Sequence, residues 1–494
     1  GYETMKDLNH ADADANIAIG NNVLSTVAAQ ALHSCVGIGH GALDAVNHAN
    51  ALGTVAIGRD ALGQLTNGEG NLAIGYEAAK TVQGGEYNTV IGYSALEDGD
   101  VSHMTMVGYR AGQSINSADA KGSVGIGVRA LTSVTSGQGN VAIGSGSLAV
   151  EDDGDFNTAI GTQALAVQTG VSGTVSNTAI GYKAGTNITT GVRNVFIGSD
   201  VAAGTTNVDR SVAIGYAAMG NANVTADGDG TIAIGYTALL ALTSGIANTA
   251  IGYQALLVED DGDYNTAVGY GVFEKQTGTS GTVANTGVGY RAGYYNTTGV
   301  KNTYIGYHSG FGVSGNANSS NSALGYRSLV GITTGTVNTA MGESAGASVT
   351  TASGSVFLGA DAGGTVTTGN DNIAIGYDAM KGGTVTGDNN IAIGTSALDA
   401  VTSGHDNIGI GHEAHTRLTT GIHNIAMGFN AHAQNAVTGN YNVAIGFFAL
   451  GDDAGGSNNV AIGYTAGRDQ IGVSGSVYIG ENAGHSVSTG QQNI

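Results

Sequence analysis

Hydrophobic and polar positions repeat along the whole chain in one short pattern, of which residues 248–256, Asn-Thr-Ala-Ile-Gly-Tyr-Gln-Ala-Leu, are the clearest copy. An aliphatic residue followed by Gly recurs 27 times, mostly 17 residues apart, with steps of 16 to 20. We number each copy from this Gly, so Gly252 is position zero, Ile251 is −1 and Tyr253 is +1. Fixed short periods of this kind are typical of solenoids and repeat arrays. The pattern predicts one short β-strand per repeat, ending at position −1.

The residues on the two faces of each predicted strand differ in size. Position −1 is Ile, Val, Leu or Met in all 27 copies, and position −3 is usually Thr, Val or Ile. Residues of one parity share a strand face, so we expect −3 and −1 to occupy a dry environment. Position −2 is Ala or Gly in 21 of 27 copies, which predicts that another backbone approaches closely there. Both faces of the strand are therefore expected to be covered.

A turn precedes each predicted strand. Position −4 is Asn in 19 of 27 copies, Asn248 among them, and a frequent Gly lies three residues earlier. Asn tolerates left-handed backbone and bonds locally, and stacked identical Asn side chains can also hydrogen-bond along a column. We expect this Asn at the corner of each coil, with a ladder of Asn side chains running from coil to coil.

Side-chain size at position −2 correlates with size at position +4. Where −2 is very large, +4 is Gly or Ala rather than the usual Leu or Met. This inverse relation between side-chain volumes predicts that the two columns pack against each other. In one straight strand they would lie about 20 Å apart, so the chain must bend after +1, or the contact must cross to another coil or chain. The pairs are Met106 with Gly112, Phe196 with Ala202, Tyr304 with Gly310, Phe357 with Gly363, and Tyr478 with Gly484.

The predicted fold is an all-β parallel β-solenoid, or β-roll, that occupies residues 1–494 as one continuous region of about 28 coils, each of 16 to 20 residues. With 85 Gly and few helix-forming runs, helices of useful length are disfavoured. Proline is absent, which suits coils that donate hydrogen bonds to their neighbours. The 20-residue steps predict loops at 168–176, 220–230 and 276–284. The sequence begins and stops within a repeat, so we expect a window of a longer chain.

Composition narrows the classes of function. The net charge of −22 repels nucleic acid and anionic membranes, so neither is expected as a partner. The sequence contains no run of 18 apolar residues, so no membrane span is predicted. The single cysteine, Cys35, stands at a −4 position and is expected to be a small corner residue.

Three groups of residues could carry chemistry. Tyr fills position +1 in half of the repeats, as at Tyr253, and predicts either packing or an aromatic stripe for sugars or receptors. The Glu-Asp-Asp-Gly-Asp segments at 151–155 and 259–263 are expected to be acidic surface turns, or alternatively Ca²⁺ ligands. The carboxylates concerned are Asp152, Asp153, Asp155, Asp260, Asp261 and Asp263.

Histidines and catalytic motifs give weaker evidence of a functional site. His405, His412, His415 and His423 are close in sequence, but their spacing matches no zinc signature, so we expect structural roles. No nucleophile elbow or phosphate loop stands out from the Gly-rich background. We therefore expect no catalytic residue, no cofactor and no enzyme activity, with Asn248, Ile251, Gly252, Tyr253 and Ala255 serving structure.

The Asn-Thr-Ala-Ile-Gly-Tyr-x-Ala-Leu unit, with Thr-Gly-x-x-Asn before it, resembles the head repeats of trimeric autotransporter adhesins and the repeat regions of phage tail fibres. The resemblance covers essentially the whole chain and concerns architecture rather than target. It implies a side-by-side homotrimer of left-handed β-rolls whose small residues permit close packing between chains. It also implies an extracellular structural fibre, at a cell or virion surface, that mediates adhesion, with an unidentified surface or matrix receptor. The alternatives are a viral tail-fibre shaft for host recognition and, less favoured, an ice-binding, carbohydrate-binding or polysaccharide-cleaving solenoid.

Overall fold

The computed structural model describes residues 1–6, 13–26, 32–48, 50–115, 117, 119–150, 153–169, 173–220, 224, 228–278, 281–433, 437–453, 455–487 and 492. Within these residues the chain is an all-β parallel β-solenoid without an α-helix. Its 27 three-residue strands delimit about 26 turns. This is slightly fewer than the 28 coils expected, because the partial repeats at the two ends contribute no described strand. The chain divides into two compact units, Gly1–Asn248 and Thr249–Ile494.

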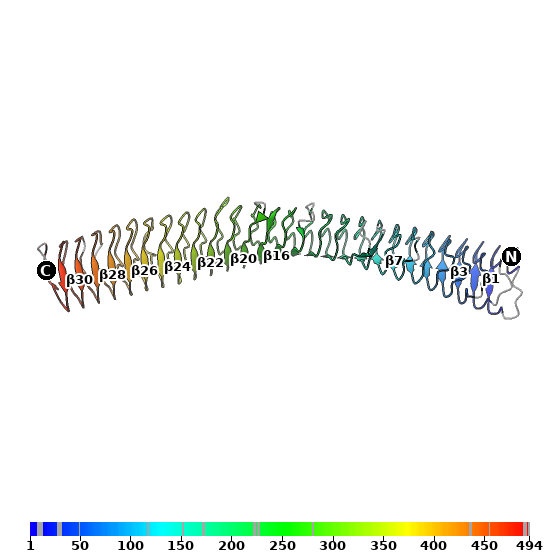
Figure 1. Ribbon diagram of the computed structural model, residues 1–494, viewed down its shortest axis with the longest axis horizontal. Coiled ribbons are helices and arrows are strands. Elements are labelled where there is room, and N and C mark those ends of the chain that lie inside the picture. The colour runs from blue at the N-terminus through cyan, green and yellow to red at the C-terminus, as the bar shows by residue number, and fades with distance from the viewer. Residues whose placement is uncertain are drawn as a thin grey trace. The chain divides into compact units, whose positions relative to one another are not determined.

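In the first unit the strands are β1 (Ile17–Ile19), β2 (Val36–Ile38), β3 (Val55–Ile57), β4 (Leu72–Ile74), β5 (Thr89–Ile91), β6 (Thr105–Val107), β7 (Val124–Ile126), β8 (Val141–Ile143), β9 (Gly154–Asp155), β10 (Thr158–Ile160), β11 (Gly173–Thr174), β12 (Thr178–Ile180), β13 (Val195–Ile197), β14 (Val212–Ile214) and β15 (Ile232–Ile234). All but β9 and β11 join one parallel sheet, in which each strand pairs in register with the strand of the next coil. Successive coils therefore stack in the order of the chain (Figure 1).

In the second unit the strands are β16 (Thr249–Ile251), β17 (Gly262–Asp263), β18 (Thr266–Val268), β19 (Gly281–Thr282), β20 (Thr286–Val288), β21 (Thr303–Ile305), β22 (Ser322–Leu324), β23 (Thr339–Met341), β24 (Val356–Leu358), β25 (Ile373–Ile375), β26 (Ile391–Ile393), β27 (Ile408–Ile410), β28 (Ile425–Met427), β29 (Val443–Ile445), β30 (Val460–Ile462) and β31 (Val477–Ile479). The arrangement is the same, with β17 and β19 outside the main sheet.

Glycine at position zero makes the bend that follows each strand. Gly394 has φ +132°, and a Cβ there would lie 2.5 Å from the carbonyl oxygen of Gly411 in the next coil. An L-side chain is thus excluded both by the backbone conformation and by the close approach of the next coil. Ser396 and Leu398 then take φ values of 53° and 51°, which turn the chain back over the strand.

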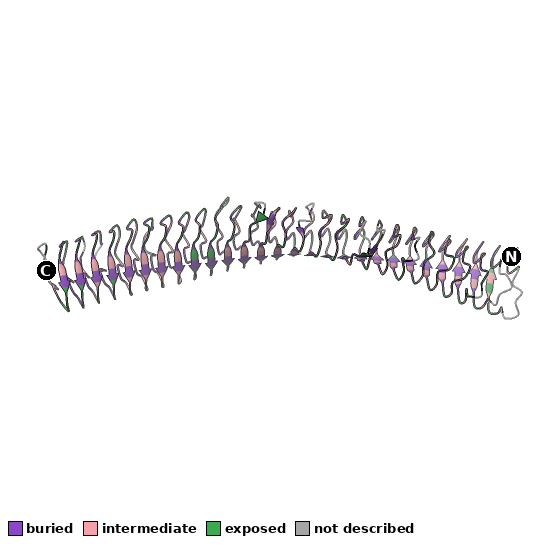
Figure 2. Ribbon diagram, viewed as in Figure 1, coloured by how far each residue is buried: buried purple, intermediate pink, exposed green. Residues whose placement is uncertain are grey.

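The interior of the coil is filled by the small residues of the strand and by the residues after the bend. Ala392 at −2, Ala397 at +3 and Leu398 at +4 are all fully buried. Ile391 and Ile393, at −3 and −1, face outward and are only partly buried, and Figure 2 shows this alternation along the strands. For a single chain, the expectation that −3 and −1 form the dry face was wrong.

Position −2 also differs from the prediction. A Cβ added at Gly287 would meet the side chains of Val272 and Phe273, at 2.4 and 2.6 Å. One added at Gly409 would meet the backbone carbonyl oxygen of Ala414 and the side chain of Leu398, each at 3.1 Å. Small residues at −2 therefore make room for the core residues of the same chain, and they are not available to a second chain. The interpretation that the Ala and Gly face lies between chains was wrong for the same reason.

The predicted contact between positions −2 and +4 is confirmed. A Cβ added at Gly363 would lie 2.1 Å from Cδ1 of Phe357, and one at Gly310 would lie 2.5 Å from Cδ1 of Tyr304. Neighbouring coils make the same contact, since a Cβ at Gly346 would lie 2.9 Å from Cδ2 of Phe357. The bend after the strand is what folds the +4 column back over the −2 column.

The Asn column at position −4 forms the predicted ladder. The Asn407 backbone N–H donates to Oδ1 of Asn390 at 3.1 Å, and the Asn424 N–H donates to Oδ1 of Asn407 at 3.0 Å. The Asn407 Nδ2 also donates to the Gly421 carbonyl of the next coil at 2.9 Å. Each Asn is buried, so these bonds satisfy backbone groups that water cannot reach.

Two of the predicted loops contain additional strand pairing. Gly173–Thr174 pairs in parallel with Gly154–Asp155, and Gly281–Thr282 pairs with Gly262–Asp263. The acidic segments that were expected to be turns are therefore partly short strands. Residues 170–172, 221–223, 225–227 and 279–280 of the predicted loops lie outside the described residues.

Candidate interaction surface

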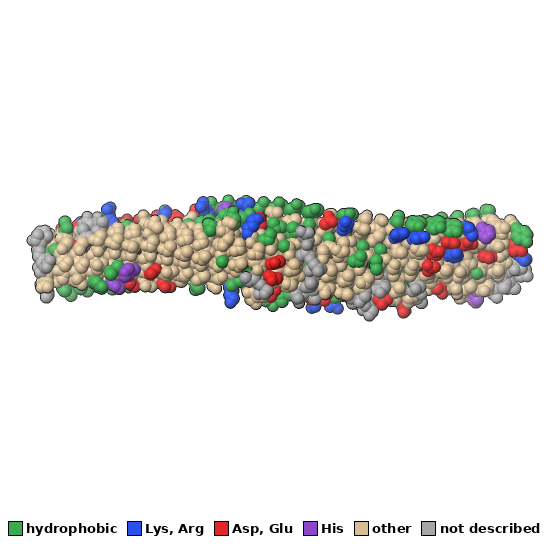
Figure 3. Space-filling model, turned by 90° about the horizontal axis from the view of Figure 1, so that it is seen from above, with side chains coloured by type: hydrophobic (Ala, Val, Ile, Leu, Met, Phe, Trp, Pro, Cys, Tyr) green, Lys and Arg blue, Asp and Glu red, His purple; other side chains and the backbone are tan. Residues whose placement is uncertain are grey.

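The outward face of the sheet carries a strip of apolar side chains in each unit. We call the residues at positions −3, −1 and +1 of the repeats the outer strip. At position −1 the exposed fraction is 36% for Ile251, 36% for Ile305 and 43% for Leu324. Because the strands pair in register, each of these side chains stands beside the equivalent residue of the next coil. Figure 3 shows hydrophobic side chains gathered mainly along one long edge of the surface drawn there.

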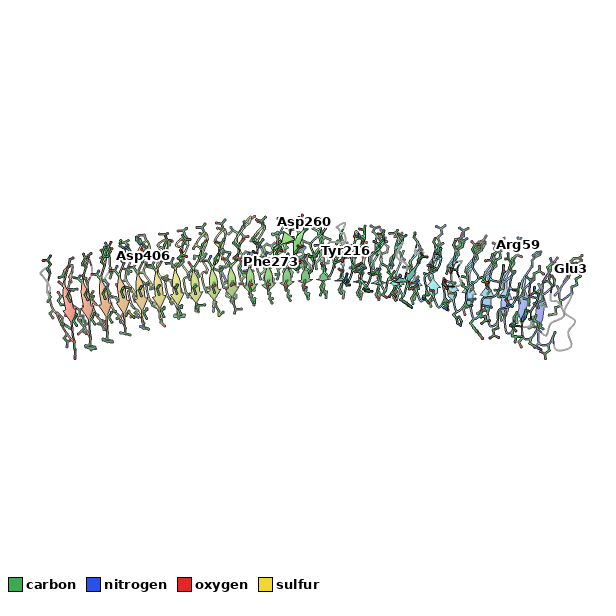
Figure 4. All side chains as sticks on the ribbon, viewed as in Figure 1. Glu3, Arg59, Tyr216, Asp260, Phe273 and Asp406 are labelled. Atoms are coloured by element: carbon green, nitrogen blue, oxygen red, sulfur yellow. The ribbon has the colours of Figure 1, made fainter. Side chains whose placement is uncertain are left out.

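Tyrosines at position +1 stack into ladders along the outer strip. In the second unit Tyr253, Tyr270, Tyr290, Tyr307 and Tyr326 follow one another with ring centroids 4.8 to 5.2 Å apart. In the first unit Tyr76 stacks on Tyr93 at 4.8 Å, and Tyr216, labelled in Figure 4, stacks on Tyr236 at 5.4 Å.

This stacking bears on what the tyrosines can bind. The rings within a ladder are nearly parallel, at 6° for Tyr253 and Tyr270 and 10° for Tyr290 and Tyr307. Each ring face therefore covers the next ring, and mainly the edges are left exposed. A sugar stacks on an open aromatic face, so the geometry favours the packing interpretation of this column over the sugar-binding one.

Cations lie against the aromatic residues around Tyr290. The Arg291 guanidinium is 5.3 Å from the centre of the Tyr290 ring and 4.9 Å from that of Tyr294. His308 stacks on Tyr307 at 4.1 Å, and burial followed by repulsion from Arg291 lowers its pKa. These contacts tie the ladder to the turn that follows it.

The candidate carboxylates of the first acidic segment bind the chain's own groups. Asp153 Oδ1 accepts a hydrogen bond from Ser136 Oγ at 2.6 Å, and Asp155 Oδ1 accepts one from the Gln138 N–H at 2.8 Å. Asp152 lies outside the described residues. The two described carboxylates join neighbouring coils, as structural residues would.

In the second acidic segment the structure brings Glu259, Asp260 and Asp261 together, with oxygens within 4.8 Å of one another. Asp263 is not part of this group. The Asp260 Oδ1 accepts from the Gly278 N–H at 3.0 Å (Figure 4). Glu259, which is fully buried, accepts from the Gly262 N–H at 2.8 Å, and burial raises its pKa to about 7. Cation binding by this loop stays a prediction.

Two histidine pairs form between coils. His405 and Asp406 in one turn lie beside His423 in the next, and their ligand atoms are within 4.8 Å of one another. His415 and His432 are fully buried, with ring centroids 5.0 Å apart. The sequence spacing of the histidines revealed neither pair, although the +4 position of His415 and His432 was a usable signal for burial.

The buried pair has no hydrogen-bond partner for any of its four ring nitrogens. Burial lowers the pKa of His432 to about 4 and lowers that of His415 in the same direction, with repulsion from His432 as a second cause. Both imidazoles are therefore neutral at pH 7.

Cys35 occupies the Asn column, as predicted. Its backbone N–H donates to Oδ1 of Asn16 at 3.0 Å, and its thiol donates to the Ala51 carbonyl at 2.8 Å. Burial raises the pKa of this fully buried thiol, which disfavours the reactive thiolate.

Comparison with known proteins adds no relative: no protein-family model matches the chain, and a search of curated proteins finds no match. In the part of the chain that the structure describes, no helix is long and apolar enough to cross a membrane.

Proposed function

We propose that this chain is the structural shaft or head of an extracellular homotrimeric fibre that mediates adhesion or surface attachment. The observation that carries the proposal is the outer strip, in which partly exposed apolar side chains recur from coil to coil. Contiguous exposed apolar patches of more than a few hundred Å² are rare on monomeric proteins and mark interaction sites.

The small number of charged residues in the outer strip favours a binding partner whose contacting surface is apolar. None of the residues at −3 and −1 in the 27 copies is charged, although 11% of the chain is charged. At position +1 the charged residues are Arg59, Glu343 and Glu481. A solvent-facing strand surface ordinarily alternates apolar inward residues with polar or charged outward ones. Here the outward residues are Ile, Val, Leu, Met or Thr with one Ser, whereas the inward residue at −2 is Ala or Gly in 21 of 27 copies, so most strands carry their larger apolar side chains on the outward face.

The regular repetition of the strip favours a second and third copy of the same chain as its occupant. A partner with the same coil spacing can match every side chain along the strip in one register, whereas an unrelated globular protein would cover only a few coils. Homo-oligomers are also the commonest assemblies of soluble proteins. The number three follows from the resemblance to trimeric adhesin heads and tail fibres.

Light scattering of the folded chain in native buffer tests the assembly. We expect a mass of about three times the chain mass of 48.9 kDa. The variant Ile305→Glu/Leu324→Glu places two charges on the outer strip and should reduce the assembled fraction. Val337→Glu is the control, because Val337 is 63% exposed and lies at position −5, which is not part of the strip. A wild-type mass equal to one chain would overturn the proposal.

Location is tested separately by labelling the intact cells or virus particles that carry the protein with an antibody against residues 249–494. Label on the outer surface is the expected result. Label that appears only after the cells are made permeable would contradict an extracellular fibre.

A further inference from the structure

Three metal-ligating side chains converge on one edge of the second unit. His405 and Asp406 are neighbours in the turn that precedes strand β27, and His423 lies in the corresponding turn before β28. The two turns are joined by a backbone hydrogen bond from the His423 N–H to the His405 carbonyl at 3.2 Å. The turn of His405 is also held from inside, because the buried Asn407 donates from Nδ2 to the same carbonyl at 3.1 Å. The ligand-bearing backbone is therefore fixed by the solenoid.

The side chains face one another across the two turns. The Asp406 Oδ2 lies 2.6 Å from Nδ1 of His405 and 3.9 Å from Nδ1 of His423. The two imidazole rings are nearly perpendicular, at 84°, with centroids 5.7 Å apart. The ring of Tyr441 stacks on His423 at 5.1 Å and limits the directions that this imidazole can take.

We propose that His405, Asp406 and His423 bind a divalent transition-metal ion, with Zn²⁺ the best match, through two imidazole nitrogens and one carboxylate oxygen. Zn²⁺ takes His nitrogens at about 2.0–2.1 Å and Asp oxygens at about 2.0–2.2 Å, with four ligands in a tetrahedron. Ligand atoms around such an ion are roughly 3.3 Å apart. To reach that value the 2.6 Å separation between Asp406 and His405 must widen and the 3.9 Å separation between Asp406 and His423 must shorten, and rotation of these partly exposed side chains would make both changes.

Donor chemistry selects the class of ion. Imidazole nitrogens suit Zn²⁺, Cu²⁺ and Ni²⁺, whereas Ca²⁺ and Mg²⁺ prefer oxygen ligands. The net charge of −22 also draws cations toward the protein.

A bound ion would link two consecutive coils. Its ligands come from positions −6 and −5 of one repeat and position −5 of the next, and water or a further group would complete the tetrahedron. Because all three ligands belong to one chain, the site is independent of the fibre proposal and forms in a monomer or a trimer alike.

Titration of the full 494-residue chain with ZnCl₂, followed by calorimetry, tests the proposal. We expect one saturable ion per chain, and we expect His405→Asn, His423→Asn and Asp406→Asn each to weaken the affinity at least tenfold. Co²⁺ added in place of Zn²⁺ should give the visible absorption of a tetrahedral site in the wild type and lose it in these variants. All three positions are on exposed turns, and circular dichroism checks that the variants keep the fold.

Two histidines provide matched controls. His412→Asn removes an imidazole that lies 4.0 Å from Glu413, and His33→Asn removes one that lies 2.6 Å from Asp14. Neither belongs to a three-residue group among the described residues, so both variants should bind Zn²⁺ as the wild type does. The proposal is overturned if the wild type shows no saturable site, or if its affinity survives in both His405→Asn and His423→Asn.

Discussion

The buried pair His415 and His432 makes the stability of its coils depend on pH. Both side chains occupy the +4 column between Leu398 and Leu450, which are themselves fully buried. The pKa of His432 falls from 6.5 to about 4 because burial penalises the charged imidazolium. The folded-state pKa is thus below the unfolded value, so protons bind preferentially to the opened chain, and local stability falls as the pH drops from about 6.5 to 4.

The size of this effect follows from the shift in pKa. Each pKa unit corresponds to about 1.36 kcal/mol, so His432 alone removes about 3 kcal/mol by pH 4. His415 shifts in the same direction and adds to the loss. Above pH 6.5 both rings are neutral in either state and contribute no pH dependence.

The perturbation is the double substitution His415→Leu/His432→Leu. Leucine fits because Leu398 and Leu450 occupy the same column on either side. It also removes four buried ring nitrogens that have no hydrogen-bond partner, so the variant should be at least as stable as the wild type at pH 7.5.

The assay is hydrogen exchange of peptides that span residues 411–433, corrected for the intrinsic pH dependence of exchange. A local method is needed because a long repeat array does not unfold as a single cooperative unit. Wild-type protection of these peptides should fall about 100-fold or more between pH 7.5 and 4, and the variant should lose little. His103→Leu, which removes an exposed imidazole, should behave as the wild type. Equal pH slopes in the wild type and the double variant would refute the reasoning.

Three further substitutions probe the coil. Asn338→Ala should lower the local stability measured by hydrogen exchange by roughly 2–6 kcal/mol, because it leaves two buried backbone groups without a hydrogen-bond partner. Asn338→Ser should lower it by less. Phe357→Ala and Gly363→Leu should each lower local stability, by about 3–5 and at least 1–3 kcal/mol. Hydrogen exchange of peptides that contain residues 357–363 should show partial recovery in the double variant, and strictly additive losses would contradict the contact between positions −2 and +4. Because burial raises the pKa of Glu259 from 4.5 to about 7, the wild type should lose about 3 kcal/mol of local stability as the pH rises between these values. Glu259→Gln should abolish this loss. If the pH profile of hydrogen exchange at residues 254–278 is the same in the variant and the wild type, the prediction is wrong.

The period of the sequence was sufficient to predict much of the coil. It located every three-residue strand, the Asn ladder and the contact between positions −2 and +4. These features depend on residues within one repeat or at equivalent positions of adjacent repeats. A strict period brings equivalent positions together in any parallel stack, whichever way the side chains face.

Tertiary structure decided which strand face is inside. Both parities are apolar, and hydrophobicity alone favours Ile over Ala for the interior. The bend at Gly394 brings Ala397 and Leu398 back over the strand, which leaves room only for a side chain as small as Ala392. The larger Ile391 and Ile393 must therefore face outward, and that consequence of coil width is invisible in the pattern of one strand.

The histidine sites also show the difference between what the sequence predicts and what the tertiary structure decides. The sequence places His405 and His423 18 residues apart, in a spacing that matches no metal signature. They meet because one turn of the solenoid spans that interval and sets the two turns side by side in register. The sequence by itself determined the repeat, the corner and the inverse relation between side-chain volumes, because these are periodic. Only the tertiary structure decided what faces water and which polar side chains meet, because both depend on how the chain closes each turn.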